Sequence, residues 1–345
     1  MAFRIDTIEL VRRHPLIIAR GRKGNQRNLF LRLEHQGEVG LGEIAPNVVA
    51  GNDSAADCER QLRAFLEEHT PTSDRPENTW SAAREAGLAP CVIAGLDVAL
   101  WDLRARRAGQ PLYRLLKLQR RSVPTSVTLS LMPPNAVSER LRELLARTGA
   151  RQLKVKLGSP DGPEADRAIM RAVWALPETR HLGIKVDANG GWSLREARTM
   201  MRWLAERSVV LVEQPLAQGC EEQLTDLFRD RPLPLFVDES CAFSTDIPPI
   251  AEAVDGVNLK LQRCGGVTEA LRFAATARQH ALDLMIGCLC ESSVSISTAA
   301  SLASLANHVD LDAHLNLVND PATGPGFNDG VVLPAEAAGH GARLR

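Results

Sequence analysis

The N-terminal third of the chain alternates apolar and polar residues with the period of two that is typical of β-strands, and then takes the period of amphipathic helices. Strands followed by helices predict a compact α+β unit. Glycine and proline predict a break in the second helix after Arg107. The expected elements are strands at 3–10 ("FRIDTIEL") and 29–35 ("LFLRLEH"), then a turn at 36–43 ("QGEVGLGE"), and helices at 54–69 and 90–118.

From residue 122 onward, short apolar runs are separated by amphipathic helical stretches. Eight runs occur at intervals of roughly 20–30 residues, an alternation that predicts parallel βαβ units. Eight such strands are enough to close a barrel. The runs lie at 125–130, 152–157, 183–187, 210–213, 235–238, 256–261, 284–288 and 308–312.

This change of pattern predicts two domains, an α+β domain at 1–121 and a barrel domain at 122–319. The loop-rich segment 320–345 is expected to pack back on the first domain. The basic run "RGRKGNQR" (20–27) lies between two strand candidates and is expected to form a mobile loop.

Composition excludes several classes of partner. The 345 residues are 44% hydrophobic, and 41 basic against 42 acidic residues leave a net charge of −1, so no overall field favours nucleic acid or an anionic membrane. No apolar stretch approaches the roughly 18 residues of a membrane span, and the N-terminus lacks the apolar run of a signal peptide. Seven cysteines without zinc-like pairing favour a reducing compartment. We therefore expect a soluble, cytoplasmic protein.

Charged residues recur near the C-terminal ends of the otherwise apolar barrel strands. Side chains alternate along a strand, so Lys154 and Lys156 share a face. One such residue could cap a helix or lie on a solvated face, but buried charges are too costly to recur on six strands for packing alone. Active sites of these barrels lie at this end. The residues are Lys154, Lys156, Asp187, Glu213, Asp238, Glu239, Lys260, Asp310 and Asp312.

Asp187, Glu213 and Asp238 lie on consecutive strands with no histidine or cysteine beside them. Oxygen ligands alone favour a hard cation such as Mg²⁺. Lysines on the second and sixth strands would flank this cation from opposite sides of the barrel.

At this point the sequence resembles a known family. The ordered motifs "KVKLG", "VDANGGW", "VEQP", "FVDES", "NLKLQRCGG" and "GCLCES", together with "GEVGLGEIAPN" and "GLDVALWDLRARRAGQPLYRLL", are similar to the enolase superfamily, in its muconate lactonizing enzyme subgroup. The resemblance covers nearly the whole chain. It implies an α/β fold, a modified TIM barrel (β/α)₇β with an N-terminal α+β capping domain.

The resemblance also implies a reaction. One Mg²⁺ per subunit would be held by Asp187, Glu213 and Asp238, and Lys156 and Lys260 would be the acid/bases of a 1,1-proton transfer through an enediolate. A lysine acts as a base only after losing its proton, so its pKa must be lowered, which Lys154 and the metal would promote through like charge.

Asp310 and Asp312, in "VDLD", resemble the D-x-D signature of dipeptide epimerases such as L-Ala-D/L-Glu epimerase, where paired carboxylates hold the α-ammonium group of the substrate. Alternatively, one of them caps a loop and the other is solvated. By the same resemblance, Arg20 falls where an acidic second residue would be recognised. Alternatively, the basic cluster of Arg20, Arg22 and Lys23 binds the C-terminal carboxylate of any dipeptide or faces solvent. The other residues that the resemblance places on the substrate are Thr128, Lys154, Cys288 and Cys290, and it places Asn189 and Glu239 beside the metal ligands.

The favoured prediction is a Mg²⁺-dependent dipeptide epimerase, an isomerase that acts as a homo-oligomer on a small dipeptide. An o-succinylbenzoate synthase or N-acylamino acid racemase would share the metal and lysines but has no ammonium to bind. A non-catalytic relative would have no need of this set of charged residues. Gly190 replaces the usual glutamine of the epimerases, and "DLDAHLNL" replaces their "DLDGP", so these two changes affect specificity.

Overall fold

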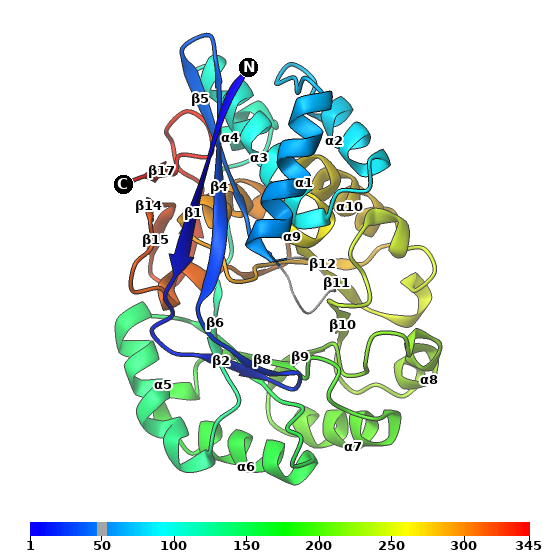
Figure 1. Cartoon of the computed structure of the whole chain (residues 1–345). Coiled ribbons are helices and arrows are strands. Elements are labelled where there is room, and N and C mark those ends of the chain that lie inside the picture. The colour runs from blue at the N-terminus through cyan, green and yellow to red at the C-terminus, as the bar shows by residue number, and fades with distance from the viewer. Residues whose placement is uncertain (47–53) are drawn as a thin grey trace.

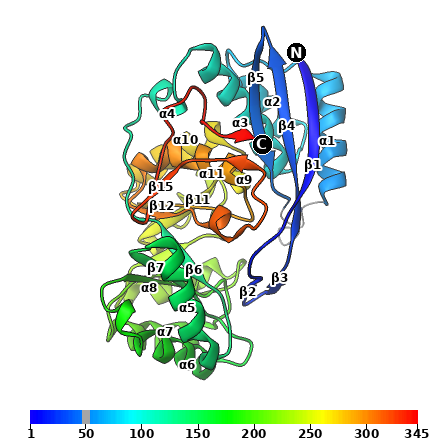
Figure 2. The ribbon, with the colours of Figure 1, turned by 90° about the vertical axis from the view of Figure 1, so that its left-hand side faces the viewer.

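The computed structural model of the protein describes residues 1–46 and 54–345 (Figure 1). An antiparallel sheet with its helices lies beside a barrel of parallel strands, and the two views of Figures 1 and 2 show the sheet standing along one side of the barrel. The predicted fold class, a modified TIM barrel with an N-terminal α+β unit, is confirmed. Among the described helices, none is long and apolar enough to cross a membrane.

The N-terminal sheet has the strand order β1–β4–β5, and both pairs are antiparallel. Glycines of β5 allow α3 to approach closely, because a Cβ atom at Gly42 would lie 1.9 Å from the carbonyl oxygen of Gly95. Because β5 pairs with β4 from Glu38 onward, the predicted turn at 36–43 is wrong beyond Gly37, and Gly40 and Gly42 belong to a strand. The elements are β1 (Ala2–Leu10), β4 (Gln26–His35), β5 (Glu38–Ile44), α1 (Ala55–Glu68), α2 (Pro76–Glu85), α3 (Pro90–Arg107) and α4 (Leu112–Leu115). The sequence prediction did not include α2.

The barrel consists of eight parallel strands in the order β6 to β13. A parallel bridge from Thr125 to Val309 joins its first and last strands, and the Leu311 amide donates to Thr125 Oγ1 over 2.7 Å. All eight predicted strands occur. They are β6 (Ser126–Leu129), β7 (Gln152–Lys156), β8 (Gly183–Asp187), β9 (Val209–Glu213), β10 (Leu235–Val237), β11 (Gly256–Lys260), β12 (Asp283–Gly287) and β13 (His308–Asp310).

Helices surround the barrel and bury their apolar faces against its strands. The longer ones carry apolar residues on one face, as the sequence pattern predicted. They are α5 (Pro134–Thr148), α6 (Pro163–Trp174), α7 (Leu194–Ala205), α8 (Leu224–Arg229), α9 (Leu261–Cys264), α10 (Val267–Gln279) and α11 (Ser293–Leu302).

The C-terminal segment contacts the N-terminal unit. The His340 amide donates to Asp102 Oδ1 over 2.8 Å, and Arg106 donates to the carbonyl oxygen of Ala342. The short strands of the C-terminal segment are β14 (Ala322–Thr323), β15 (Gly326–Asn328), β16 (Val331–Leu333) and β17 (Arg343–Leu344). The division of the chain into domains at residue 121 stays a prediction.

A hairpin of β2 (Leu16–Ile18) and β3 (Gly21–Lys23) extends from the N-terminal sheet across the mouth of the barrel (Figures 1 and 2). The Leu131 amide, which follows β6, donates to the carbonyl oxygen of Ile17 over 2.9 Å. The predicted mobile loop at 20–27 is therefore wrong, because this run forms β3 and the start of β4. The hairpin is held by contacts with distant parts of the chain, which a local pattern does not reveal.

Glu43 of β5 connects the sheet to the barrel. Its fully buried carboxylate accepts hydrogen bonds from Asn28 Nδ2, from the amide and hydroxyl of Ser292, and from the Ser295 amide, at 2.8–3.2 Å. Asn28 also donates to the carbonyl oxygen of Cys290, in the loop that leads to α11. This network therefore fixes the position of a loop that borders the barrel mouth.

We expect Glu43→Ala to lower the free energy of unfolding by about 3 kcal/mol or more, because several buried donors lose their acceptor. Urea unfolding followed by circular dichroism measures the change. Glu38→Ala, at an exposed position of the same strand, is the matched control and should change stability by less than about 0.5 kcal/mol. Equal losses for the two variants would contradict the role given to this network.

Candidate active site

Five neighbouring strands bring a row of charged side chains to the mouth of the barrel. Lys156 ends β7, Asp187 ends β8, Glu213 ends β9, Asp238 follows β10 and Lys260 ends β11. The lysines lie at the two ends of the row, where Lys156 Nζ is 2.5 Å from Asp187 Oδ2 and Lys260 Nζ is 2.8 Å from Asp238 Oδ2. The strand order thus places the two ammonium groups on opposite sides of three carboxylates.

Lys154 lies beneath this row and is fully buried. Its Nζ is 2.6 Å from Glu213 Oε2, 2.7 Å from Asp310 Oδ2 and 3.6 Å from Asp187 Oδ2. Burial lowers the pKa of Lys154, but Asp310 and Glu213 outweigh burial and raise it. Lys154 is therefore a charged group that links carboxylates across the barrel.

Glu213 stands between two other carboxylates, and burial together with the charges of Asp187 and Asp238 raises its pKa to about 7. Burial opposes ionisation of Asp187 and Asp238 as well, but the neighbouring cations outweigh it and lower both pKa values. Three buried carboxylates that repel one another form an oxygen donor set suited to a hard divalent cation. Within the described ranges, no group of three or more acidic, histidine or cysteine side chains is placed to hold a metal ion, and lysine ammonium groups contact these three carboxylates.

Burial lowers the pKa of Lys260, but the charge of Asp238 outweighs this and raises it above the usual range. This direction is the opposite of the lowering that a catalytic base was expected to show. The largest raising cause is the ion pair with Asp238, and the charges of Glu213 and Glu239 add to it. A cation bound to Asp238 and Glu213 would weaken this attraction.

Asp310 and Asp312 lie across the barrel from Glu213. Asp310 ends β13, and its Oδ1 is buried without a hydrogen-bond partner among the described residues. Asp312 Oδ2 accepts from the Thr128 amide over 2.7 Å, and the Cys288 thiol donates to the carbonyl oxygen of Asp310 over 3.2 Å. Burial, and then the charge of Asp310, raise the pKa of Asp312 to about 6. Two carboxylates are thus held together at one wall of the site.

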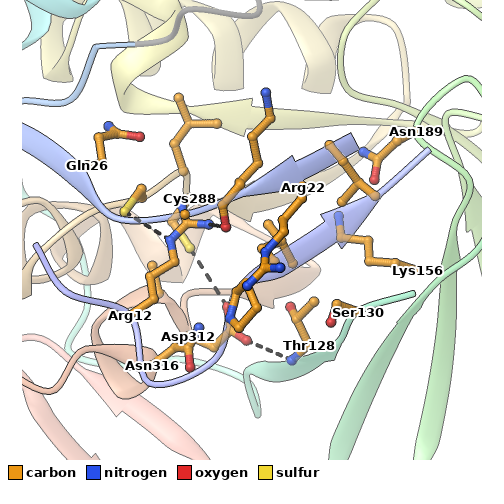
Figure 3. A pocket seen from close by; sticks show the side chains of 18 of the residues that line it. Arg12, Arg22, Gln26, Thr128, Ser130, Lys156, Asn189, Cys288, Asp312 and Asn316 are labelled. Carbon is orange, nitrogen blue, oxygen red and sulfur yellow. Dashed lines mark hydrogen bonds between the residues drawn. The ribbon is translucent and has the colours of Figure 1, made fainter. Parts of the chain in front are cut away.

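A cavity of about 870 Å³ opens above these groups, between the barrel and the hairpin (Figure 3). Most of the sequence-predicted site residues line it, whereas Lys154, Asp187 and Glu213 are fully buried below its floor. The lining residues from the prediction are Arg20, Thr128, Lys156, Asn189, Asp238, Glu239, Lys260, Cys288, Cys290, Asp310 and Asp312. Figure 3 shows Lys156, Thr128, Asp312 and Cys288 around one space.

Arg20 was predicted to contact the substrate, but the structure places its guanidinium on Glu239. Nη2 forms an ion pair with Glu239 Oε1, and Nη1 donates to the carbonyl oxygen of Asn189 over 2.9 Å. The backbone amide of Asn189 in turn donates to Asp187 Oδ1 over 2.8 Å. Arg20 therefore connects the hairpin with the loops that carry two of the predicted metal ligands.

The sequence reasoning missed several polar residues that hold these carboxylates. Asn258 donates to Glu213 Oε1 over 2.8 Å, Arg263 donates to Asp238 Oδ1 over 2.5 Å, and Gln214 accepts from the Asp238 amide over 2.8 Å. The alternation that placed Lys154 beside Lys156 also places Asn258 on the same face as Lys260, so this residue could have been found. The contact of Gln214 depends on the loop that follows β9, and that of Arg263 depends on α9, which follows β11.

Comparison with known families decides the classification. A model described as "Mandelate racemase / muconate lactonizing enzyme, N-terminal domain" matches residues 4–117, and one described as "Enolase C-terminal domain-like" matches residues 136–345. The chain belongs to the enolase superfamily. The family predicted from the motifs is thereby confirmed.

Within the enolase superfamily, the similar proteins with known activities include dipeptide epimerases. A "Hydrophobic dipeptide epimerase" from Roseobacter litoralis is 52% identical over 100% of this chain and 99% of its own. Another protein of the same name, from a Flavobacteria bacterium, is 44% identical over 100% of this chain and 99% of its own. The crystal structure of a dipeptide epimerase from Enterococcus faecalis, in complex with Mg and L-Leu-L-Tyr, is 28% identical, with a TM-score of 0.90, and covers 99% of this chain and 98% of that one.

Proposed function

We propose that this protein is a Mg²⁺-dependent dipeptide epimerase that acts on dipeptides with hydrophobic side chains and inverts the α-carbon of their C-terminal residue. The observation that carries this proposal is the row of three carboxylates with Lys156 and Lys260 at its two ends, facing the carboxylate pair of Asp310 and Asp312. The two relatives named hydrophobic dipeptide epimerases, at 52% and 44% identity, support both the reaction and the substrate class.

Asp187, Glu213 and Asp238 would hold the Mg²⁺. Their mutual repulsion, which raises the pKa of Glu213, is relieved when a divalent cation is shared among them. Bound there, Mg²⁺ supplies positive charge that lowers the cost of removing a proton α to the substrate carboxylate. Asn189 and Glu239 would keep the Asp187 and Asp238 loops in place from outside this set.

Lys156 and Lys260 would be the acid/bases. A lysine on each side of the α-carbon can take its proton from one face and return it on the other, which is the geometry that inversion needs. Lys154, whose ammonium group is kept charged by Asp310 and Glu213, would contribute positive charge beside the substrate carboxylate. Lys154 lies below the floor of the cavity and does not line it, so it is not placed to act as a base.

Asp310 and Asp312 would bind the α-ammonium group of the dipeptide. The buried Oδ1 of Asp310 lacks a hydrogen-bond partner among the described residues, and a buried acceptor of this kind is costly unless a ligand completes it. Thr128, Cys288 and Cys290 complete this wall of the cavity and would contact the rest of the substrate. An N-acylamino acid or a succinylbenzoate precursor has no ammonium group to offer here.

We further propose that the enzyme works in the cytoplasm and as a homo-oligomer. The seven cysteines without zinc-like pairing support a reducing compartment. The oligomeric state is proposed from the resemblance to the family, and gel filtration with light scattering tests it.

The decisive experiment incubates the purified protein with Mg²⁺ in D₂O and a library of L,L-dipeptides, and measures deuterium uptake by mass spectrometry with and without EDTA. We expect metal-dependent uptake at the C-terminal α-carbon, greatest for hydrophobic dipeptides. Uptake by N-acylamino acids, or turnover of a succinylbenzoate precursor, with no uptake by any dipeptide would overturn the proposal.

We expect the KM for dipeptides to rise as the pH falls through about 6. Asp312, whose pKa is raised to about 6, is ionised above this pH and protonated below it, so its attraction for the ammonium group is lost on the acidic side. Initial rates between pH 5 and 8 measure the effect. Asp312→Asn should have a high KM that no longer changes near pH 6, and a wild-type KM that stays constant there would contradict the role of this carboxylate.

A further inference from the structure

Five cations of the hairpin and its flanking residues border the cavity, and they differ in what they contact. They are Arg12, Arg20, Arg22, Lys23 and Arg27. Of the five, only Arg20 forms an ion pair within the described part of the chain. Arg12 donates to the carbonyl oxygen of Lys23 and to Cys290 Sγ, and Figure 3 shows Arg22 in the same space as Lys156 and Asp312.

We infer that Glu239 sets the substrate specificity by occupying Arg20, so that the pocket has no free cation at this position for an acidic side chain of the dipeptide. Both residues line the cavity. The Glu239 side chain is only 12% exposed and that of Arg20 35% exposed, so the pair is partly shielded from water. This inference deepens the proposed function and rests on it for the substrate.

The position of Glu239 makes the ion pair costly to exchange. Its Oε1 accepts from Arg20 and also from Asn189 Nδ2 over 3.3 Å, and its Oε2 has no hydrogen-bond partner among the described residues. An acidic substrate side chain would have to share Arg20 with this carboxylate, against the repulsion of like charges, or displace it. The displaced carboxylate would remain mostly buried beside Asp238 without its cation, which is strongly unfavourable. A hydrophobic side chain requires no such exchange.

The same ion pair closes the hairpin over the cavity. Ala19, at the tip of the hairpin, packs on two glycines of the barrel loops, since a Cβ atom at Gly158 or Gly191 would lie 3.2 or 2.9 Å from Ala19 Cβ. Arg20, the next residue, then reaches Glu239 and the carbonyl oxygen of Asn189. Arg20 and Glu239 therefore act as positioning residues for the hairpin, and Arg20 stays paired within the chain.

Kinetics on a matched pair of substrates, L-Ala-L-Leu and L-Ala-L-Glu, test the specificity. Glu239→Gln keeps the shape and an acceptor oxygen but removes the charge, and we expect it to raise kcat/KM for the acidic dipeptide relative to the hydrophobic one by about 10- to 100-fold. The double variant Glu239→Gln/Arg20→Gln should lose this gain. Arg20→Gln alone should raise KM for both dipeptides and leave their ratio at the wild-type value.

Hydrogen exchange of the hairpin amides at 16–23 tests the closure without any substrate. Arg20→Gln and Glu239→Gln should both speed this exchange, whereas Arg22→Gln, which removes the same charge from the same hairpin, should not. Hydrogen exchange of the hairpin remains informative if the wild-type protein exchanges the α-proton of no dipeptide. That outcome would overturn the proposed function alone.

Two results would overturn the inference. One is an unchanged substrate ratio and unchanged hairpin exchange in Glu239→Gln. The other is a wild-type protein that prefers the acidic dipeptide and loses that preference in Arg20→Gln, because Arg20 would then bind the substrate directly. If Glu239→Gln does not fold, Arg20→Gln still tests the inference through its ratio of kcat/KM for the two dipeptides and through the hydrogen exchange of its hairpin.

Discussion

Lys156→Met and Lys260→Met are each expected to abolish epimerisation of a hydrophobic dipeptide, with a loss of about 10²- to 10⁴-fold or more in rate. The lysines lie at opposite ends of the carboxylate row, on β7 and β11, so each can reach only one face of the α-carbon. Inversion needs both, because one removes the proton and the other returns it.

The two variants should nevertheless differ in a way that loss of folding cannot imitate. Each retains one lysine, which can remove and return the proton on its own face. We therefore expect one variant to exchange the α-proton of the L,L-dipeptide with D₂O and the other that of the L,D-dipeptide. Proton NMR of each stereoisomer in D₂O, with the two variants in separate reactions, measures this.

Lys185→Met is the control for these variants. Lys185 is a fourth buried lysine of the barrel, on β8, and its Nζ donates to Ser126 Oγ over 3.0 Å below the site. It does not line the cavity, so the variant should still exchange both stereoisomers. Epimerisation that persisted in either Lys156→Met or Lys260→Met would contradict the two-lysine mechanism.

The barrel could be predicted from the sequence because its strands are short apolar runs buried on both faces, and such runs stand out against amphipathic helices. The strand at 183–187 was predicted with its observed ends. The hairpin at 16–23 and helix α2 were not predicted. Each depends on packing against distant residues, as when the Trp80 indole of α2 donates to the carbonyl oxygen of Gly265 over 3.0 Å.

The candidate site follows the same division. Strand alternation and the common direction of parallel strands were enough to bring Lys156, Asp187 and Lys260 together. The partner of Arg20 could not be predicted, because Glu239 is 219 residues away and the hairpin that carries Arg20 was expected to be a loop. The sequence indicated that Arg20 is a cation at the cavity. Only the tertiary structure shows that Arg20 forms an ion pair with Glu239 of the same chain.

Removal of the metal with EDTA is expected to abolish deuterium exchange and to lower the melting temperature, and Mg²⁺ is expected to restore both. A ligand that binds only the folded state stabilises it by about 2.7 kcal/mol at a free concentration of 100 times Kd. The gain should be specific to the predicted ligands. In Glu213→Gln, which removes the central carboxylate of the three but keeps its shape, Mg²⁺ should no longer raise the melting temperature, and exchange activity should be lost.

Glu222→Gln makes the same substitution at an exposed position in the short 3-10 helix Glu221–Gln223 after β9, and it should keep the full response to Mg²⁺. The melting temperature reports metal binding independently of catalysis, so the two predictions can fail separately. If Mg²⁺ stabilised the wild-type protein but the protein were inactive on every substrate, the predicted metal site would stand and the predicted reaction would be wrong. If Mg²⁺ still raised the melting temperature of Glu213→Gln, the ion would bind elsewhere. Burying Glu213 between Asp187 and Asp238 is costly, and a cation bound by all three carboxylates is the reason we give for that cost.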